Sequence, residues 1–415
     1  SRPIPPPTPR RVMPMSPLPP PNAPSAAAAQ PEAHSTEHAA LAAAVALSNP
    51  LRCTPPTLQG IDASAIARRS HQLGTTPAVA HHLNALGLGA QLGGWDRQLV
   101  HETVARNMLA LTLAQEAARL LEEEAGIRSA ALKGLAALLD WYGENIGLRK
   151  MFDTDLLIDA ATFTRAHQVL VEHGWTRVIE GPVTSRVNVE AVFIQRFGRS
   201  GSNYEVKLEL HRALTFPGRF WIHPGRLWDR AIRLDTTPRW RLDPIDALLY
   251  LAVHKVQHGY RNDARDLFDA ANLLHHHPQL DWDRLIVRAQ RWGATAAAWL
   301  FLRRARRAAL APVPDAILTL LRPCHPRATL LDHLMPDATT DLQFRQRRTH
   351  QIPLNRRLLG LAAAADRPQT EVAALTAIAV RRWGDAALSS LPMGLGERLA
   401  AHTLDLLPLF AQPLR

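Results

Sequence analysis

The spacing of hydrophobic and polar positions changes twice along the chain. From Glu37 to Ala125 apolar residues recur every three or four positions, which predicts helices, the clearest of them over about 96–124. Between about 127 and 235, short alternating or apolar runs predict strands with short helices between them. From Asp243 onward the helical spacing returns. We therefore expect an α+β protein in which a small mixed sheet lies between two helical regions.

The same pattern divides the chain into four segments. Residues 1–36 hold twelve of the 32 prolines and a run of alanines. We expect them to form a disordered tail, because they bury too little apolar surface to offset the entropy of ordering. The other segments are a helical region at 37–126, an α/β core at 127–235 and a helical region at 236–415.

Individual elements are also predicted. In the core, strands are expected at about 129–132, 153–158, 175–179, 187–197 and 203–211, and helices at 134–142 and 163–172. A turn at 198–201 would join the last two strands. Beyond the core, helices are expected at 282–292, 294–310, 370–383 and 396–407. No element is predicted at 311–369, which prolines interrupt.

Composition excludes several classes of protein. With 415 residues, 47% of them hydrophobic, the chain can bury a large core. Two cysteines, Cys53 and Cys324, cannot build a disulfide-stapled scaffold or a four-cysteine zinc site. No stretch approaches the ~20 apolar residues that span a bilayer, so we expect no membrane segment and a cytoplasmic protein.

The net charge of +11 first suggests a nucleic-acid partner. Only four of the 48 basic residues are lysine, however, and an arginine bias beside abundant alanine is better explained by the base composition of the gene. The cluster Arg303–Arg307 is short, and no nucleic-acid-binding motif accompanies it. A nucleic-acid partner is therefore not expected.

The candidate chemistry centres on an Asp-x-Asp pair, Asp153 and Asp155, in a predicted strand. Residues i and i+2 of a strand point to the same side, roughly 6–7 Å apart. Two such carboxylates repel each other unless a cation lies between them, and Mg²⁺ prefers hard oxygen ligands of this kind. Two solvated aspartates on a strand edge are the simpler alternative.

Three neighbouring features strengthen the case for a phosphate and metal site. Lys133 and Gly134 stand at a strand-to-helix junction, where the backbone and the helix N-terminus favour a phosphate group. Arg149 stands shortly before the aspartates, where it would contact substrate or pair with Asp153. Glu209 lies on the polar face of an alternating strand and supplies a candidate third carboxylate.

Together these residues resemble the nucleotidyltransferase superfamily of the DNA polymerase beta type, and more closely its bacterial branch of uncharacterised nucleotidyltransferase family proteins. The resemblance covers about 95–310. The residues that carry it are Lys133-Gly134, Tyr142, Arg149, Asp153-Thr154-Asp155-Leu156-Leu157-Ile158, Gly174-Trp175, Glu209-Leu210-His211, and His254 and His258 followed by Arg265-Asp266.

The resemblance implies a nucleotidyltransferase-like core that transfers a nucleotidyl group from an NTP to a hydroxyl acceptor and releases pyrophosphate. Asp153, Asp155 and Glu209 would be the catalytic, metal-binding residues of a two-ion Mg²⁺ site. Lys133, Gly134 and Arg149 would contact the triphosphate. The acceptor would be a small molecule or a protein.

Further residues are expected to line the nucleotide site. Lys207 and His211 share the polar face of the strand that carries Glu209. His254 and His258 lie on one face of a helix, at a spacing that can also bind zinc, but Lys255 stands where a metalloprotease needs Glu. The alternatives to an enzyme are a catalytically inactive nucleotide-binding or scaffolding module and an arginine-rich nucleic-acid-binding protein.

Overall fold

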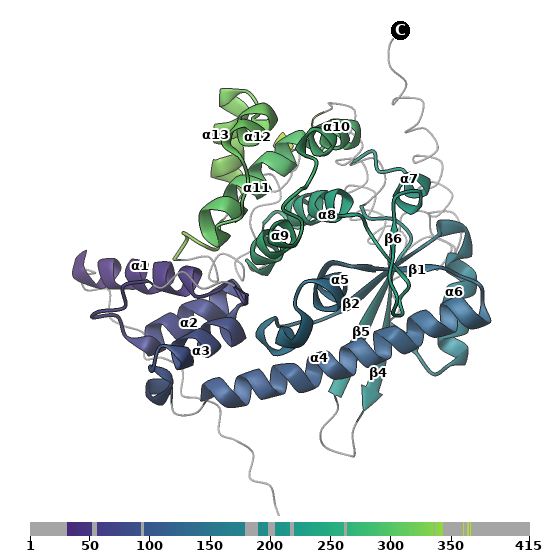
Figure 1. Ribbon diagram of the computed structural model, residues 1–415, viewed down its shortest axis with the longest axis horizontal. Helices are drawn as coiled ribbons and strands as arrows, with labels where there is room; N and C mark the ends of the chain where they lie inside the picture. The colour runs from purple at the N-terminus through teal and green to yellow at the C-terminus, as the bar shows by residue number, and fades with distance from the viewer. Residues whose placement is uncertain are drawn as a thin grey trace, which may run out of the picture.

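The computed structural model is shown in Figure 1. It describes residues 31–51, 56–92, 95–178, 190–197, 204–215, 220–260, 264–335 and 337–342, with 360, 363, 364 and 366. The helices expected at 370–383 and 396–407, the turn at 198–201 and most of the predicted tail lie outside them.

A mixed sheet of seven strands forms the centre of the molecule, in the order β3-β4-β5-β2-β1-β7-β6. The strands are β1 Ser129–Leu132, β2 Thr154–Ile158, β3 Thr176–Val178, β4 Glu190–Phe197, β5 Tyr204–His211, β6 Ile232–Arg233 and β7 Trp240–Arg241. β2 is antiparallel to β1 and parallel to β5. The strand that carries the aspartates is therefore central, and the strand that carries Glu209 is its direct neighbour.

Helices surround this sheet in three groups. Before it come α1 Pro31–Ala46, α2 Ala63–Leu73, α3 Thr76–Ala85, η1 Gly89–Leu92, α4 Trp95–Arg119 and η2 Leu120–Glu124. Between the strands lie α5 Lys133–Asp140, η3 Gly143–Leu148, η4 Ala160–Thr162, α6 Phe163–Glu172 and α7 Pro224–Trp228. After it come α8 Pro244–Gln257, α9 Arg265–His276, α10 Trp282–Trp292, α11 Thr295–Ala309, α12 Asp315–Leu321 and α13 His325–Leu334. The α+β fold class is therefore confirmed.

The two faces of the sheet have opposite character near β2 and β5. Leu156 and Ile158 of β2 and Leu208 and Leu210 of β5 point to one face, where they pack with the end of α4 and with α6. The alternate positions of these strands carry the charged residues and point to the other face, toward α8 and α9. Figure 1 shows α4 and α6 on one side of the strands and α8 and α9 on the other.

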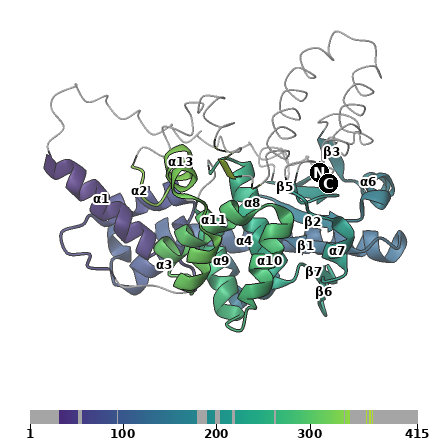
Figure 2. The same cartoon turned by 90° about the horizontal axis from the view of Figure 1, so that it is seen from above.

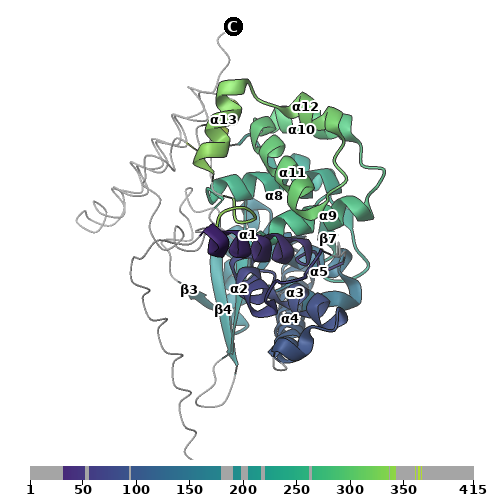
Figure 3. The same cartoon turned by 90° about the vertical axis from the view of Figure 1, so that its left-hand side faces the viewer.

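The two helical regions pack against each other as well as against the sheet. α1 lies against α2 and α11 (Figure 3), and Figure 2 shows α8 to α11 between the N-terminal helices and the end of the molecule that holds α6. Arg69 Nη1 donates to the Leu342 carbonyl over 3.0 Å, and Ala264 N donates to the Leu73 carbonyl over 2.9 Å. One hydrophobic cluster runs from α1 through α5 to α11.

Several details differ from the sequence expectations. α12 and α13 lie within 311–369, where no element was predicted. α1 begins at Pro31, six residues before the expected start of the helical region at residue 37. β7 joins the sheet at Trp240–Arg241, so the core extends past residue 235 through a strand too short to give a periodic signal. The apolar spacing that predicted the helix over 96–124 includes Met108, but its side chain is 56% exposed.

The arginine cluster at the end of α11 contacts acidic side chains of the neighbouring helices and loop. Arg303 pairs with Asp332, Arg304 and Arg307 with Asp337, and Arg306 with Asp315. These pairs join α11 to α12, α13 and residues 337–342. Among the described residues, no helix is both long and apolar enough to cross a membrane.

Candidate active site

The pairing of β2 with β5 brings the predicted carboxylates together. Asp155 lies directly opposite Glu209 in the parallel register. Ligand atoms of Asp155, Glu209 and His211 all lie within 4.8 Å of one another. Asp153 precedes Asp155 by two residues and shares its face of the sheet, although it stands outside this closest group. The convergence that the sequence predicted for Asp155 and Glu209 is therefore present.

Lys133 enters this group from the start of α5, directly after β1, the other neighbour of β2. Its Nζ lies 2.6 Å from Asp155 Oδ1 and 3.8 Å from Glu209 Oε2, and its side chain is 12% exposed. Burial alone would lower the pKa of this ammonium group, but the charges of Asp155, Tyr250, Glu209 and Asp153 together outweigh it, and the pKa is raised well above the ordinary value. The backbone of Lys133 has φ +44°, which L-residues seldom adopt.

β5 contributes two further cations. Lys207 Nζ contacts the Glu209 carboxylate, and His211 Nε2 lies 2.9 Å from Asp155 Oδ1. Burial opposes the charge of His211, but its hydrogen bonds to Asp155 and Glu209 raise its pKa to about 9. His211 Nδ1 also lies 3.6 Å from Glu190 Oε2 of β4.

The pKa values of the two outer carboxyl groups, Asp153 and Glu209, are shifted in opposite directions. Burial raises the pKa of Asp153, and the nearby charge of Asp155 raises it further. Burial also opposes the ionisation of Glu209, but the hydrogen bond from His211 and the charge of Lys133 lower its pKa well below the ordinary range. Asp153 therefore carries the least compensated negative charge in the group.

This donor set fits a divalent cation. Asp155 and Glu209 present carboxylate oxygens from adjacent strands, and a third carboxylate, Asp153, lies beside them without full compensation. Carboxylate oxygens are the protein ligands that Mg²⁺ prefers. His211 adds a nitrogen ligand that Mg²⁺ does not need, and its imidazole is instead occupied by hydrogen bonding to Asp155.

Helix α8 faces the charged side of the sheet. Tyr250 is 2% exposed, and its phenol is close enough to feel the charges of Lys133 and Asp155. The His254 ring follows one turn later, 5.9 Å from the Tyr250 ring and 4.5 Å from that of His258. Tyr250 was not among the residues predicted for the site, although its i, i+4 spacing from His254 placed it on the same helix face.

His254 is held in the neutral form. Burial, followed by the positive charge of Lys133, lowers its pKa well below the usual value. Its Nδ1 atom is buried and has no hydrogen-bond partner among the described residues. His258, in contrast, is exposed at the end of α8. Of the two predicted histidines, His254 is the one beside the cluster of Asp153, Asp155 and Glu209, which we call the carboxylate group.

Arg149 has a different partner from the one expected. Its Nε and Nη2 donate to Asp269 of α9, with Nη2 2.6 Å from Oδ2, and the pair is 6% and 1% exposed. Tyr142 Oη donates to the same carboxylate over 2.7 Å, and Asn272 Nδ2 donates to Tyr142 Oη over 3.3 Å. The expected pairing of Arg149 with Asp153 is therefore wrong, because the chain directs the guanidinium toward α9.

Gly134 explains why the guanidinium still matters to the site. A Cβ atom at this position would lie 2.5 Å from Arg149 Nη1. The turn that carries Lys133 therefore rests directly on Arg149, and only glycine leaves room for the contact. The ion pair with Asp269 fixes the guanidinium against which the Lys133-Gly134 turn packs.

Asn107 of α4 holds the segment that leads into β2. Its Nδ2 donates to the carbonyls of Ile146 and Arg149 over 2.5 and 2.7 Å, and its Oδ1 accepts from Met151 N over 3.3 Å. The side chain is 1% exposed. A polar residue within an apolar helix stripe was the only sequence signal for this role.

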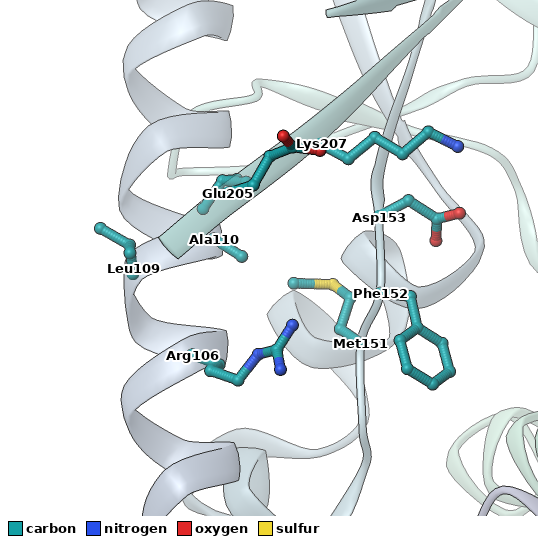
Figure 4. Close-up of a pocket in the computed structure, with 9 residues that line it drawn as sticks. Arg106, Leu109, Ala110, Met151, Phe152, Asp153, Glu205 and Lys207 are labelled. Atoms are coloured by element: carbon teal, nitrogen blue, oxygen red, sulfur yellow. The ribbon is translucent and has the colours of Figure 1, made fainter. Parts of the chain in front are cut away.

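The hollow in Figure 4 lies on the other side of these strands. It is lined by Arg106, Leu109, Ala110, Met151, Phe152, Asp153, Glu205, Val206 and Lys207. The side chains of Asp153 and Lys207 point away from α4, whereas those of Arg106 and Met151 point into the space between (Figure 4). Asp153 and Lys207 thus line the hollow, and Asp153 also belongs to the carboxylate group, which Lys207 contacts through Glu209.

Comparisons with known proteins agree with this geometry. The sequence profile of a family described as uncharacterised nucleotidyltransferase matches residues 59–309, which is more than half of the chain. No curated protein and no solved structure matches the chain. The matched range begins before α2 and ends with α11, so it includes the sheet, the carboxylate group and the helix that faces it. On this evidence the chain belongs to the family of uncharacterised nucleotidyltransferases.

Proposed function

We propose that this protein is a Mg²⁺-dependent enzyme that transfers a nucleotidyl group from an NTP to a hydroxyl of a small molecule or protein and releases pyrophosphate. One observation carries the proposal. Asp155 and Glu209 face each other on adjacent parallel strands, with Asp153 beside them and Lys133 reaching them from the start of α5. Family membership supports the same reaction class.

The proposed roles follow from position and charge. Asp153, Asp155 and Glu209 would hold Mg²⁺, which when bound lowers the pKa of an attacking hydroxyl and neutralises charge on the triphosphate. Lys133 and Lys207 would neutralise phosphate oxygens, since both ammonium groups already lie at the carboxylates.

Other residues would orient these groups. His211 would hold Asp155 in place through its 2.9 Å contact. Tyr250 and neutral His254 would close the site on the side of α8, with His258 at its outer end. Arg149, whose guanidinium is paired with Asp269, would support Gly134 and would not bind the phosphates itself.

A transfer assay tests the proposal. Purified protein is incubated with Mg²⁺, each α-labelled NTP and a cell extract, and label in products and release of pyrophosphate are measured. Asp155→Asn is expected to lower transfer by about 10³-fold or more, because it removes a carboxylate that stabilises transition-state charge. Asp159→Asn is the matched control, since Asp159 lies beyond the end of the same strand and pairs with exposed Arg128. Equal transfer by wild type and Asp155→Asn would refute the proposal.

One observation favours a second candidate, a module that binds nucleotide without turnover. Lys133 lies between the carboxylates, in a position that opposes a metal ion. Such a module would bind NTP but release no pyrophosphate with any acceptor fraction. An arginine-rich nucleic-acid binder has weaker support, since the arginines of α11 are paired with aspartates.

A further inference from the structure

The carboxyl groups of this site already have basic partners. Asp153, Asp155 and Glu209 lie among the ammonium groups of Lys133 and Lys207 and the imidazole of His211, and the half-exposed Glu190 lies 3.6 Å from the same imidazole. The contacts are direct, because Asp155 Oδ1 alone lies 2.6 Å from Lys133 Nζ and 2.9 Å from His211 Nε2. A divalent cation added to this group would leave a net positive charge in a buried place, which is costly.

Lys133 is the basic group whose position conflicts most with a metal ion. Its ammonium lies near both Asp155 and Glu209, and 12% of its side chain is exposed. Lys207 contacts Glu209 from a side chain that is 39% exposed. His211 approaches from within β5 and is fixed by the strand. The lysine side chain, in contrast, has a flexible four-carbon stem.

The support beneath Lys133 lets the side chain move while the backbone stays in place. Its φ of +44° and the packing of Gly134 on Arg149 fix the turn. Arg149 is in turn fixed by Asp269. Rotation about the side-chain bonds of Lys133 therefore changes the ammonium position without moving β1 or α5.

We propose that Lys133 is a built-in counterion that competes with the divalent cation for Asp155 and Glu209, and so makes metal binding depend on nucleotide binding. The inference rests on the proposed function. Without nucleotide, the ammonium occupies the carboxylates and keeps metal affinity low. The phosphates of a nucleotide offer Lys133 another anionic partner, so that the carboxylates become available to the metal. Nucleotide and metal then strengthen each other's binding, and by linkage the effect is the same in both directions.

Metal binding, measured apart from turnover, tests this proposal. Mn²⁺ serves as a spectroscopic probe, and its dissociation constant is measured by electron paramagnetic resonance with and without the α,β-methylene analogues of the four NTPs. The proteins are wild type, Lys133→Met, Lys133→Arg, Lys150→Met and Asp155→Asn. Lys150→Met is the matched control, because it removes a lysine charge that lies over the Phe152 ring.

The expected result is an increase in affinity for Mn²⁺ alone of about tenfold or more in Lys133→Met, within the usual range of such coupling. Lys133→Arg keeps the charge and is expected to bind Mn²⁺ as weakly as wild type. The analogues are expected to strengthen Mn²⁺ binding at least fivefold in wild type and much less in Lys133→Met. Lys150→Met should match wild type in both conditions.

Unchanged or weaker Mn²⁺ affinity in Lys133→Met, with a wild-type melting curve, would overturn the counterion proposal. If Lys133→Met does not fold, the analogue effect in wild type decides, and its absence also overturns the proposal. Loss of Mn²⁺ binding in Asp155→Asn would show at the same time that the metal binds at Asp155. Absence of Mn²⁺ binding in every protein and condition would instead overturn the proposed function.

Discussion

Two buried groups of charged residues lie close together in this protein and differ in how they are satisfied. In the first, the carboxylate of Asp269 accepts hydrogen bonds from Arg149 and Tyr142, and few polar atoms are left without a partner. In the second, on the charged face of β2 and β5, Asp155 and Glu209 crowd beside a third carboxyl group. We call these the α9 ion pair and the carboxylate group.

The difference indicates two uses of buried charge. The α9 ion pair is a single geometry in which opposite charges match, so it suits a structural joint between core and C-terminal helices. The carboxylate group gathers several carboxyl groups that share Lys133, Lys207 and His211 as partners, and such a crowded set of titratable groups is typical of a functional site. The two are linked, since Arg149 supports the turn that carries Lys133.

The largest stability effect is expected from breaking the α9 ion pair. Asp269→Asn leaves the buried guanidinium of Arg149 without a countercharge and should lower the free energy of unfolding by about 3–5 kcal/mol. Chemical denaturation measures the change. Asp159→Asn, which removes one partner of the exposed pair with Arg128, should cost less than about 1 kcal/mol. Similar losses in the two variants would show that the α9 ion pair is not the joint we describe.

The carboxylate group should show its character in the pH dependence of stability. The folded pKa of His211, about 9, exceeds its unfolded value, so its contribution is full below pH 6.5 and is lost as pH rises through about 9. Without divalent cations, we expect wild-type stability to fall by up to about 3 kcal/mol between these limits. His211→Asn should remove most of this slope. A slope of the same size in the variant would assign the effect to other groups.

The next effect concerns the hydrogen bonds with which Asn107 holds the segment that leads into β2. Asn107→Leu leaves the carbonyls of Ile146 and Arg149 without their donor and should cost about 2 kcal/mol. We also expect reduced transfer, because the segment before Asp153 loses its position. Gln98→Leu, which removes an exposed amide on the same helix, should change neither property. Full activity of a folded Asn107→Leu protein would limit Asn107 to a role in stability.

The smallest predicted change in stability is a gain, whereas the changes above are losses. Because the folded pKa of Asp153 is raised, its charge opposes folding near neutral pH. Asp153→Asn should therefore raise the free energy of unfolding by up to about 1 kcal/mol at pH 7 without metal, and the gain should shrink as pH falls toward 4. Transfer activity should be lost. Thermal melting across pH checks the gain, and a loss of stability would contradict the reading of this group as strained.

The sequence was most informative where a feature depends on near neighbours. The helix over 163–172 and the strand over 129–132 were predicted with their observed bounds, because caps, turns and apolar spacing are local. The alternation in Tyr204–His211 likewise placed Glu209 and His211 on the charged face. The candidate carboxylates were found in this way.

Other features depended on which elements lie side by side. Asn107 looked like an interruption of an apolar stripe until the segment from Ile146 to Met151 was placed against it. Tyr250 looked like an ordinary core residue until α8 was placed over the charged face of the sheet. Neither position could be recognised from its own neighbours in the chain.

By itself, the sequence determined the longer elements of the core and the side of each strand on which the charged residues lie, since backbone preference and two-residue alternation act over short distances. The tertiary structure decided which charges meet. His211 and Asp155 are 56 residues apart, and Arg149 and Asp269 are 120 apart. Such pairs depend on strand order, register and helix packing, which minimise the free energy of the whole chain and leave no mark in the local pattern.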